Sequence, residues 1–124
     1  MRRAKINRIF IPDFCGNLDL QESEQVTVEC DLANIEERDR YSVVKYGKKG
    51  DISAVKKVSS AVLKKVTKIS NYEDDEGNPI NTAEKLITDA NSGAKESIDL
   101  SMAIYRHVMG LDIDEEDEEG ESEA

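Results

Sequence analysis

The spacing of apolar residues changes once along this chain of 124 residues, and that change restricts the folds open to it. Between residues 24 and 32 the sequence EQVTVECDL alternates, so one face of an extended segment carries Val26, Val28, Cys30 and Leu32. This period of two is typical of a half-buried strand. From residue 53 onward apolar residues recur every three or four positions, which is the period of a helix. Strands first and helices later favour an α+β fold, with a small antiparallel β unit at the N-terminus followed by two or three amphipathic helices.

A first strand is predicted at residues 5–11, KINRIFI, because β-favouring residues run up to Pro12, which cannot donate to a ladder. We expect it to pair antiparallel with residues 25–32. The next segment, 35–47, allows two interpretations. Residues 35–38 open like a helix with Asn34 as its cap, whereas 42–46 resemble a strand that ends in a turn at 47–51.

The clearest predicted helix covers residues 53–69. One side of its helical wheel is apolar and the other basic. The apolar side holds Val55, Val58, Val62, Val66 and Ile69, and the basic side holds Lys57, Lys64, Lys65 and Lys68. A second helix is expected near Thr82, where Asn81 and Glu84 have the spacing of a capping box, and Asn91-Ser92-Gly93 interrupts it.

A third helix is predicted at 94–109, with Gly110 as its stop. One stripe carries Ala94, Ile98, Met102, Tyr105 and Met109, and Leu100 and Ile104 widen it. These two side chains exceed what one core face needs, so they are candidates for binding another protein. Internal packing of the same side chains is the alternative.

Charge divides the chain into two unlike halves. Residues 1–70 hold 14 Lys and Arg and 10 Asp and Glu, a net of +4, whereas residues 71–124 hold 3 and 17, a net of −14. Residues 112–124 contain nine acids and no base. We therefore expect one α+β domain at 1–110 and an acidic, disordered tail at 111–124. The tail could fold back over the lysine side of the 53–69 helix.

The same composition limits location and partners. The acidic half would repel phosphates, so no nucleic-acid partner is expected. No run approaches the ~18 apolar residues of a membrane helix, and the first residues lack the apolar core of a secretory signal. The chain is therefore expected to be intracellular, with Cys15 and Cys30 as free thiols.

The acidic run at 73–76 raises the question of a calcium loop. With Gly77 at position 6 of the EF-hand pattern, Tyr72 stands at position 1 and Ala83 at position 12, and neither supplies the required ligand. The residues from Asp75 to Pro79 are typical of a turn. We interpret the segment as a connector between two helices, with no metal site.

Catalytic patterns are also missing from the sequence. His107 is the single histidine, it lies away from the apolar stripe of its helix, and we expect it on the surface. There is no Gly-rich phosphate loop, nucleophile elbow or metalloprotease motif. The expectation is a protein that is not an enzyme and needs no cofactor.

Three segments together resemble a known family. The first is the strand closing on IPDFCGNLDLQESEQVTVEC, with Ile11-Pro12, Gly16-Asn17, Leu20 and the run 25–29 in a recognisable order. The second is IEERDRY, and the third is VTKISNYEDDEGNPINTAEKL, followed by an amphipathic helix and an acidic end. Over about residues 6–110 the chain resembles the tail assembly chaperones of long-tailed bacteriophages and prophages.

The resemblance implies a non-enzymatic protein in the cytoplasm of the bacterial host. Such a chaperone keeps the tape-measure protein soluble, helps to recruit tail-tube protein around it, and can form homo-oligomers. The candidate binding residues come from the amphipathic faces alone: Leu100, Met102, Ile104 and Tyr105 on the last helix, and Lys57, Lys64, Lys65 and Lys68 on the basic side. Two other function classes stay open: a virion structural subunit of the neck or tail-completion type, and a small acidic inhibitor that mimics nucleic acid.

Overall fold

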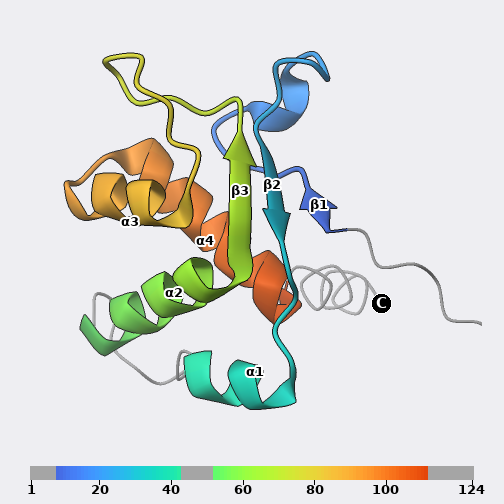
Figure 1. Cartoon of the computed structure of the whole chain (residues 1–124), viewed down its shortest axis with the longest axis vertical. Coiled ribbons are helices and arrows are strands. Elements are labelled where there is room, and N and C mark those ends of the chain that lie inside the picture. Colours follow the sequence, from blue (N-terminus) through green and yellow to red (C-terminus); the bar gives the residue numbers. More distant parts are fainter. Residues whose placement is uncertain (1–7, 43–51, 112–124) are drawn as a thin grey trace, which may run out of the picture.

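A computed structural model describes residues 8–42 and 52–111, and in them the chain is an α+β protein with a three-stranded antiparallel sheet and four α-helices (Figure 1). The elements follow one another as β1 (Ile9–Phe10), a 3-10 turn η1 (Asn17–Asp19), β2 (Thr27–Cys30), α1 (Ile35–Tyr41), α2 (Ile52–Lys65), β3 (Val66–Ser70), α3 (Ala83–Asn91) and α4 (Lys95–Met109). In this view α2 and α3 lie to the left of the sheet, α1 lies below it, and α4 crosses behind β3.

The sheet has the order β1-β2-β3, and both pairs are antiparallel. This confirms the predicted pairing of the first strand with the alternating segment, although residues 5–7 lie outside the described part. Val28 pairs with Ile69, and both side chains point into the core. Glu29 pairs with Lys68, and both are exposed on the opposite face. Leu32 was expected on the buried face but is exposed, because β2 ends at Cys30 and the chain turns toward α1.

The predicted helix at 53–69 is wrong in its last turn. The structure ends α2 at Lys65 and continues without a connector into β3. Val66 and Ile69 are still buried, but they reach the core from a strand. Two apolar residues three apart fit a helical stripe, and β-branched residues also favour a strand. The pairing of β3 with β2 decides between the two, since β2 would otherwise leave one edge without a partner.

The first helix begins as the sequence predicts. The Asn34 side chain accepts the Glu37 backbone N–H at 2.8 Å, and the Glu37 carboxylate accepts the Asn34 N–H at 3.0 Å, which completes a capping box. The same carboxylate is ion-paired with Lys65 at the end of α2. Glu37 therefore both starts α1 and fixes it against α2. The strand and turn expected at 42–51 lie almost entirely outside the described residues.

The starts and ends of the last two helices are set by local contacts. Thr82, not Asn81, caps α3, because its hydroxyl accepts the Lys85 N–H at 3.2 Å. The expected interruption at 91–93 is present, with Gly93 at φ 101°. Gly110 ends α4 in the left-handed conformation, at φ 76°, as predicted. The acidic connector joins a strand, β3, to α3 and so does not join two helices.

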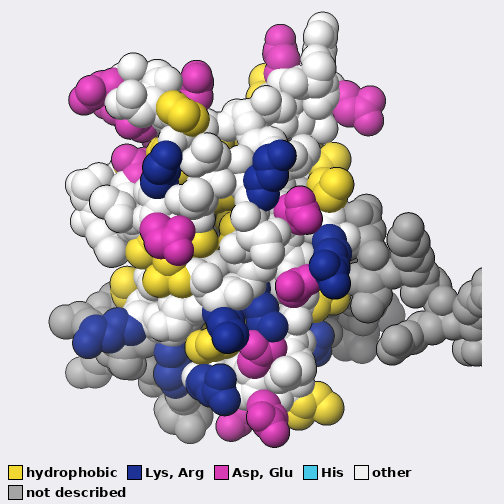
Figure 2. Space-filling model, in the orientation of Figure 1, with side chains coloured by type: hydrophobic (Ala, Val, Ile, Leu, Met, Phe, Trp, Pro, Cys, Tyr) yellow, Lys and Arg dark blue, Asp and Glu magenta, His cyan; other side chains and the backbone are white. Residues whose placement is uncertain are grey.

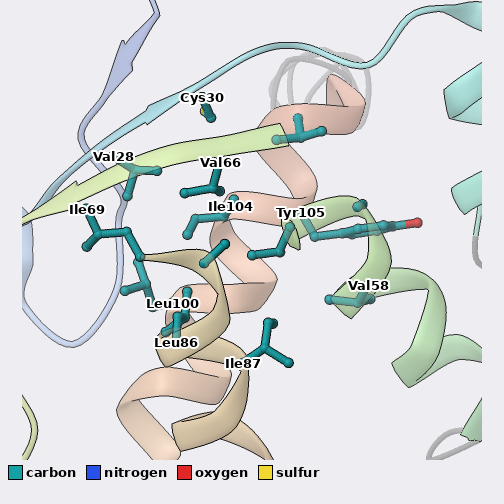
Figure 3. Close-up of a cluster of buried hydrophobic side chains, with 14 of the residues drawn as sticks. Val28, Cys30, Val58, Val66, Ile69, Leu86, Ile87, Leu100, Ile104 and Tyr105 are labelled. Atoms are coloured by element: carbon teal, nitrogen blue, oxygen red, sulfur yellow. The ribbon is translucent and has the colours of Figure 1, made fainter. Parts of the chain in front are cut away.

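The core lies between the sheet and the helices (Figure 3). Val28 and Ile69 reach it from the sheet, Leu86 from α3, and Leu100 and Ile104 from α4. All five side chains are almost completely buried. Burial of such side chains stabilises the fold by about 1.5–3 kcal/mol each relative to exposure.

A buried asparagine fixes the long connection between β1 and β2. Asn17 is 2% exposed. Its amide nitrogen donates to the Pro12 carbonyl at 2.9 Å and to the Val26 carbonyl at 3.1 Å, and its oxygen accepts the Val26 N–H at 2.8 Å. One side chain thus satisfies three backbone groups across the connection, and it holds the chain in place as it enters β2.

Candidate protein-binding surfaces

The α4 residues chosen from the sequence divide into a buried group and an exposed one. Leu100 and Ile104 are both 0% exposed, and Tyr105 is buried as well. The expectation that the first two form a surface is therefore wrong in the folded chain, and the alternative of internal packing is confirmed. The mean direction of the eight buried residues of α4 lies roughly 90° around the helix from that of the predicted stripe.

Two serines account for the difference between the predicted stripe and the buried face of α4. Ser97 and Ser101 lie on the buried face although they are polar. The Ser101 hydroxyl donates to the Ser97 carbonyl at 2.8 Å, and the Ser97 hydroxyl donates to Asp89 at 2.5 Å. Small polar side chains that are satisfied in this way can be buried at little cost. A stripe assigned from apolar residues alone does not include them.

The exposed side of α4 carries what we term the α4 strip, Ile98 and Met102. Their side chains are 43% and 40% exposed and lie one turn apart, at positions i and i+4. Lys95 and Asp99 flank the strip and are ion-paired at 2.7 Å. This contact raises the pKa of Lys95 and lowers that of Asp99, so both stay charged at neutral pH. The strip is apolar in the middle and charged along its side.

The loop after β1 lies beside this helix. The Cys15 sulfur is 3.6 Å from the Asp99 carboxylate and can donate to it. Partial desolvation and the carboxylate raise the pKa of the Cys15 thiol, so the reactive thiolate is disfavoured. Cys30 is buried and its pKa is raised to about 11, chiefly by burial. Both cysteines are free, as expected.

The four candidate lysines do not form one face. Lys65 is ion-paired with Glu37, and the Lys57 ammonium donates to the Ser42 carbonyl at 3.0 Å, so both make contacts within the chain. Lys64 is exposed at the end of α2, and Lys68 is exposed on β3. The helical wheel had grouped Lys68 with the other three because it extended the helix through β3.

Exposed basic side chains nevertheless gather over α1 and α2 (Figure 2). Arg38 and Arg40 on α1 and Lys56 and Lys64 on α2 are exposed, and so are Glu36 and Asp39 on α1. Residues 34–42 and 52–70 hold seven Lys and Arg and three Asp and Glu, a net of +4. The two arginines come from a segment whose fold the sequence left open, so the wheel of the 53–69 helix could not include them.

Acidic side chains gather at the opposite end, along the connector between β3 and α3 (Figure 2). A hollow of about 560 Å³ lies there, lined by Tyr72, Glu73, Asp74, Asp75, Asp89, Ser92, Gly93, Ala94 and Glu96. Below it the Tyr72 hydroxyl contacts Ser97 at 2.7 Å, and Ser97 contacts Asp89. Burial raises the pKa of Tyr72. Within the described residues, no three acidic, His or Cys side chains converge as metal ligands would.

The acidic connector is organised by one of its own side chains. The Asp74 carboxylate accepts the backbone N–H groups of Glu76 and Asn78, each at 2.9 Å. These bonds lower the pKa of Asp74, and the bond from the Asn78 N–H has the largest effect. The interpretation of this run as turn chemistry is confirmed, and Asp74 supplies the fixed geometry.

One apolar side chain on α1 is far more exposed than the others. Ile35, the first residue of α1, is 87% exposed beside a shallow hollow of about 640 Å³ lined by Ala33, Asn34, Glu36 and Arg38.

His107 was expected on the surface, but it is partly buried. Its ring stacks on Phe10 with centroids 3.9 Å apart. The N-terminal strand thus covers this side of α4.

The described helices include none that is long and apolar enough to cross a bilayer. No protein-family model, curated protein or solved structure matches this chain.

Proposed function

We propose that this protein is a non-enzymatic assembly chaperone that binds the tape-measure protein of a long-tailed bacteriophage in the cytoplasm of the bacterial host. It keeps this client soluble and assists assembly of the tail-tube protein around it. The α4 strip carries the proposal, because it exposes two apolar side chains one turn apart beside an ion pair. The family resemblance of residues 6–110 supports the same role.

The strip suits a helical client for geometric reasons. A helix that presents apolar residues at i and i+4 can pack against Ile98 and Met102 along one line of contact. Lys95 and Asp99 then meet the polar margin of the client helix. Ile35 is more exposed, but it is one side chain at the end of a seven-residue helix and offers no second apolar position one turn away.

The strip is small, so one copy binds weakly. A chaperone that coats a long client covers it through many separate weak contacts, so one copy can leave without the others. Each copy can also leave when tail-tube subunits replace it. The proposal therefore predicts several copies per client and a client complex that dilution dissociates.

Co-expression with the long helical protein of the same gene cluster tests the proposal. The wild-type chain is expected to move that client into the soluble fraction, and Ile98→Asp/Met102→Asp is expected to leave it insoluble. Ile35→Asp is the matched control, since it also places a carboxylate at an exposed apolar position. Circular dichroism of each variant checks its fold. A client that stays insoluble with the wild-type chain would refute the chaperone role.

Purified particles distinguish the chaperone from a structural subunit. The proposal expects the protein to be absent from finished particles and present in infected cells during assembly. A fixed number of copies in every particle would instead indicate a neck or tail-completion subunit.

A further inference from the structure

The connection between β1 and β2 carries two exposed leucines. Leu18 lies within η1 and is 51% exposed, and Leu20 directly follows η1 and is 45% exposed. Figure 1 shows that this part of the connection projects beyond the sheet. We define the leucine loop as residues 16–25. It presents two large apolar side chains to solvent on a protruding part of the molecule.

Three amide side chains fix the backbone of the leucine loop. The first belongs to the buried asparagine described above. The second is Gln25, whose amide nitrogen donates to the carbonyls of Leu18 and Leu20 at 3.4 and 3.3 Å. The third is Asn71, which follows β3 and donates to the carbonyls of Ser23 and Gln25 at 3.2 and 3.1 Å. Because these bonds hold the loop in place, little conformational entropy is lost when a partner contacts the leucines.

The leucine loop and the segments next to it in the sequence carry only negative charge. Residues 9–37 contain no Lys or Arg. The connector that follows β3 continues this pattern, since residues 71–84 hold five acids and no base. In Figure 2 acidic side chains lie on the projecting part of the molecule. Four exposed acids lie on the loop or just before it: Asp13, Asp19, Glu22 and Glu24.

We propose that the leucine loop is a docking site for a basic amphipathic helix of a partner protein. Leu18 and Leu20 contact the apolar face of that helix, and the acids beside them pair with the Lys or Arg residues at its margins. The negative charge selects this occupant, because the same acids repel nucleic acid. A second copy of the chain, with its net charge of −10, is also repelled. The site is separate from the α4 strip and does not depend on the proposed function.

The two kinds of side chain contribute differently to binding. Burial of the exposed parts of the leucines supplies most of the affinity. Exposed ion pairs contribute little to affinity at physiological salt, but they orient the partner and speed its association. Binding is therefore expected to depend strongly on the leucines at any salt concentration, and on the acids chiefly at low salt.

A nuclear magnetic resonance titration of the isotope-enriched full chain tests this inference. The probe is a synthetic helical peptide of Leu and Lys, with the leucines along one face. A second peptide with Ala in place of Leu keeps the helix and the charge. The first peptide is expected to shift the amide signals of residues 17–24, and the second to bind about tenfold more weakly.

Residue-by-residue signals are needed because the chain offers a second acidic segment. Residues 112–124 lie outside the described part and contain nine acids, so they attract any basic peptide. Both peptides carry the same charge, and this attraction is therefore common to them. A difference between the two peptides reports on apolar contact alone.

Variants of the loop locate that contact. Leu18→Ser/Leu20→Ser should weaken binding of the leucine peptide about tenfold, whereas Leu32→Ser, at a position that is 44% exposed, should leave it unchanged. Asp19→Asn/Glu22→Gln keeps both leucines and should weaken binding at low salt but not in 1 M NaCl.

Three outcomes would overturn the inference. The first is equal affinity for the two peptides, and the second is that the largest shifts lie outside residues 13–25. The third is a shift of the signals of residues 17–24 when the chain is concentrated without peptide, since the occupant would then be a second copy.

Discussion

Replacing Asn17 by alanine should destabilise the fold well beyond what a surface substitution does. The side chain is 2% exposed and makes three hydrogen bonds to the backbone of Pro12 and Val26. Its removal leaves two carbonyls and one N–H without these partners in a buried place. A net hydrogen bond is worth about 1 kcal/mol, and a buried group that loses its partner costs about 1–3 kcal/mol. Part of this cost is recovered where water enters the space, so we expect a loss of about 2–4 kcal/mol.

That loss is a large part of the stability of a small protein, which is about 5–15 kcal/mol. At about 4 °C per kcal/mol for a chain of this length, the melting temperature should fall by roughly 8–16 °C. Urea unfolding followed by far-ultraviolet circular dichroism measures the change directly. The slope with denaturant should be unchanged, because the folded state buries the same surface.

Two variants make the Asn17 prediction specific. Asn17→Asp keeps the shape and the acceptor for the Val26 N–H, but it directs a carboxylate oxygen at two carbonyls. It should therefore destabilise at neutral pH at least as much as alanine and recover in part when acid protonates it. Asn91→Ala is the matched control, because Asn91 is exposed in the last turn of α3. It should change stability by less than about 0.5 kcal/mol. If Asn17→Ala behaves like this control, the three bonds do not stabilise the connection.

Three further outcomes are expected. Leu100→Ala should cost about 2–5 kcal/mol in urea unfolding, whereas Met102→Ala should cost less than about 0.5 kcal/mol; equal costs would contradict the observed rotation of α4. The hydrogen bond from the Asn34 N–H and, to a smaller extent, the contact with Lys65 hold the pKa of Glu37 below its ordinary value of 4.5. Its carboxylate thus stabilises the fold above that pH, and the contribution is lost as the pH falls through the lowered pKa. Urea midpoints between pH 7 and 3 should decline less steeply in Glu37→Gln. Finally, a thiol reagent should modify Cys15 in the native protein and Cys30 only after unfolding; two equally fast thiols would contradict the burial of Cys30.

The strand β2, the start of α1 and the end of α4 were predictable because each depends on neighbouring residues. The alternation of β2, the Asn34 cap and the Gly110 stop are local signals, and the structure contains all three. The change from α2 to β3 was not predictable in this way. Val66 and Ile69 fit both periods, and the choice depends on β2, some 40 residues earlier in the chain.

The candidate surface was harder to predict than the fold. Wheel arguments count apolar residues and leave out small polar ones, so they placed Met102 on the same face as Tyr105 and could not foresee the burial of Ser97. The cap at Thr82 was missed for a related reason, since two neighbouring residues could both cap α3. The contact of Cys15 with Asp99 joins positions 84 residues apart and has no signal in the sequence.

The direct passage from α2 into β3 limits how the length of this chain can change. Lys65 ends the helix and Val66 begins the strand, so no loop residue separates them. One inserted residue would turn the α2 side chains by about 100° relative to the strand, or it would exchange the inward and outward faces of β3. Either change would expose Val62 or Ile69, both of which are now buried. Insertions and deletions should therefore be rejected at residues 62–69 more strongly than in the connector at 75–78, where a longer loop adds only a few tenths of a kcal/mol to the loss of the exposed bonds to Asp74.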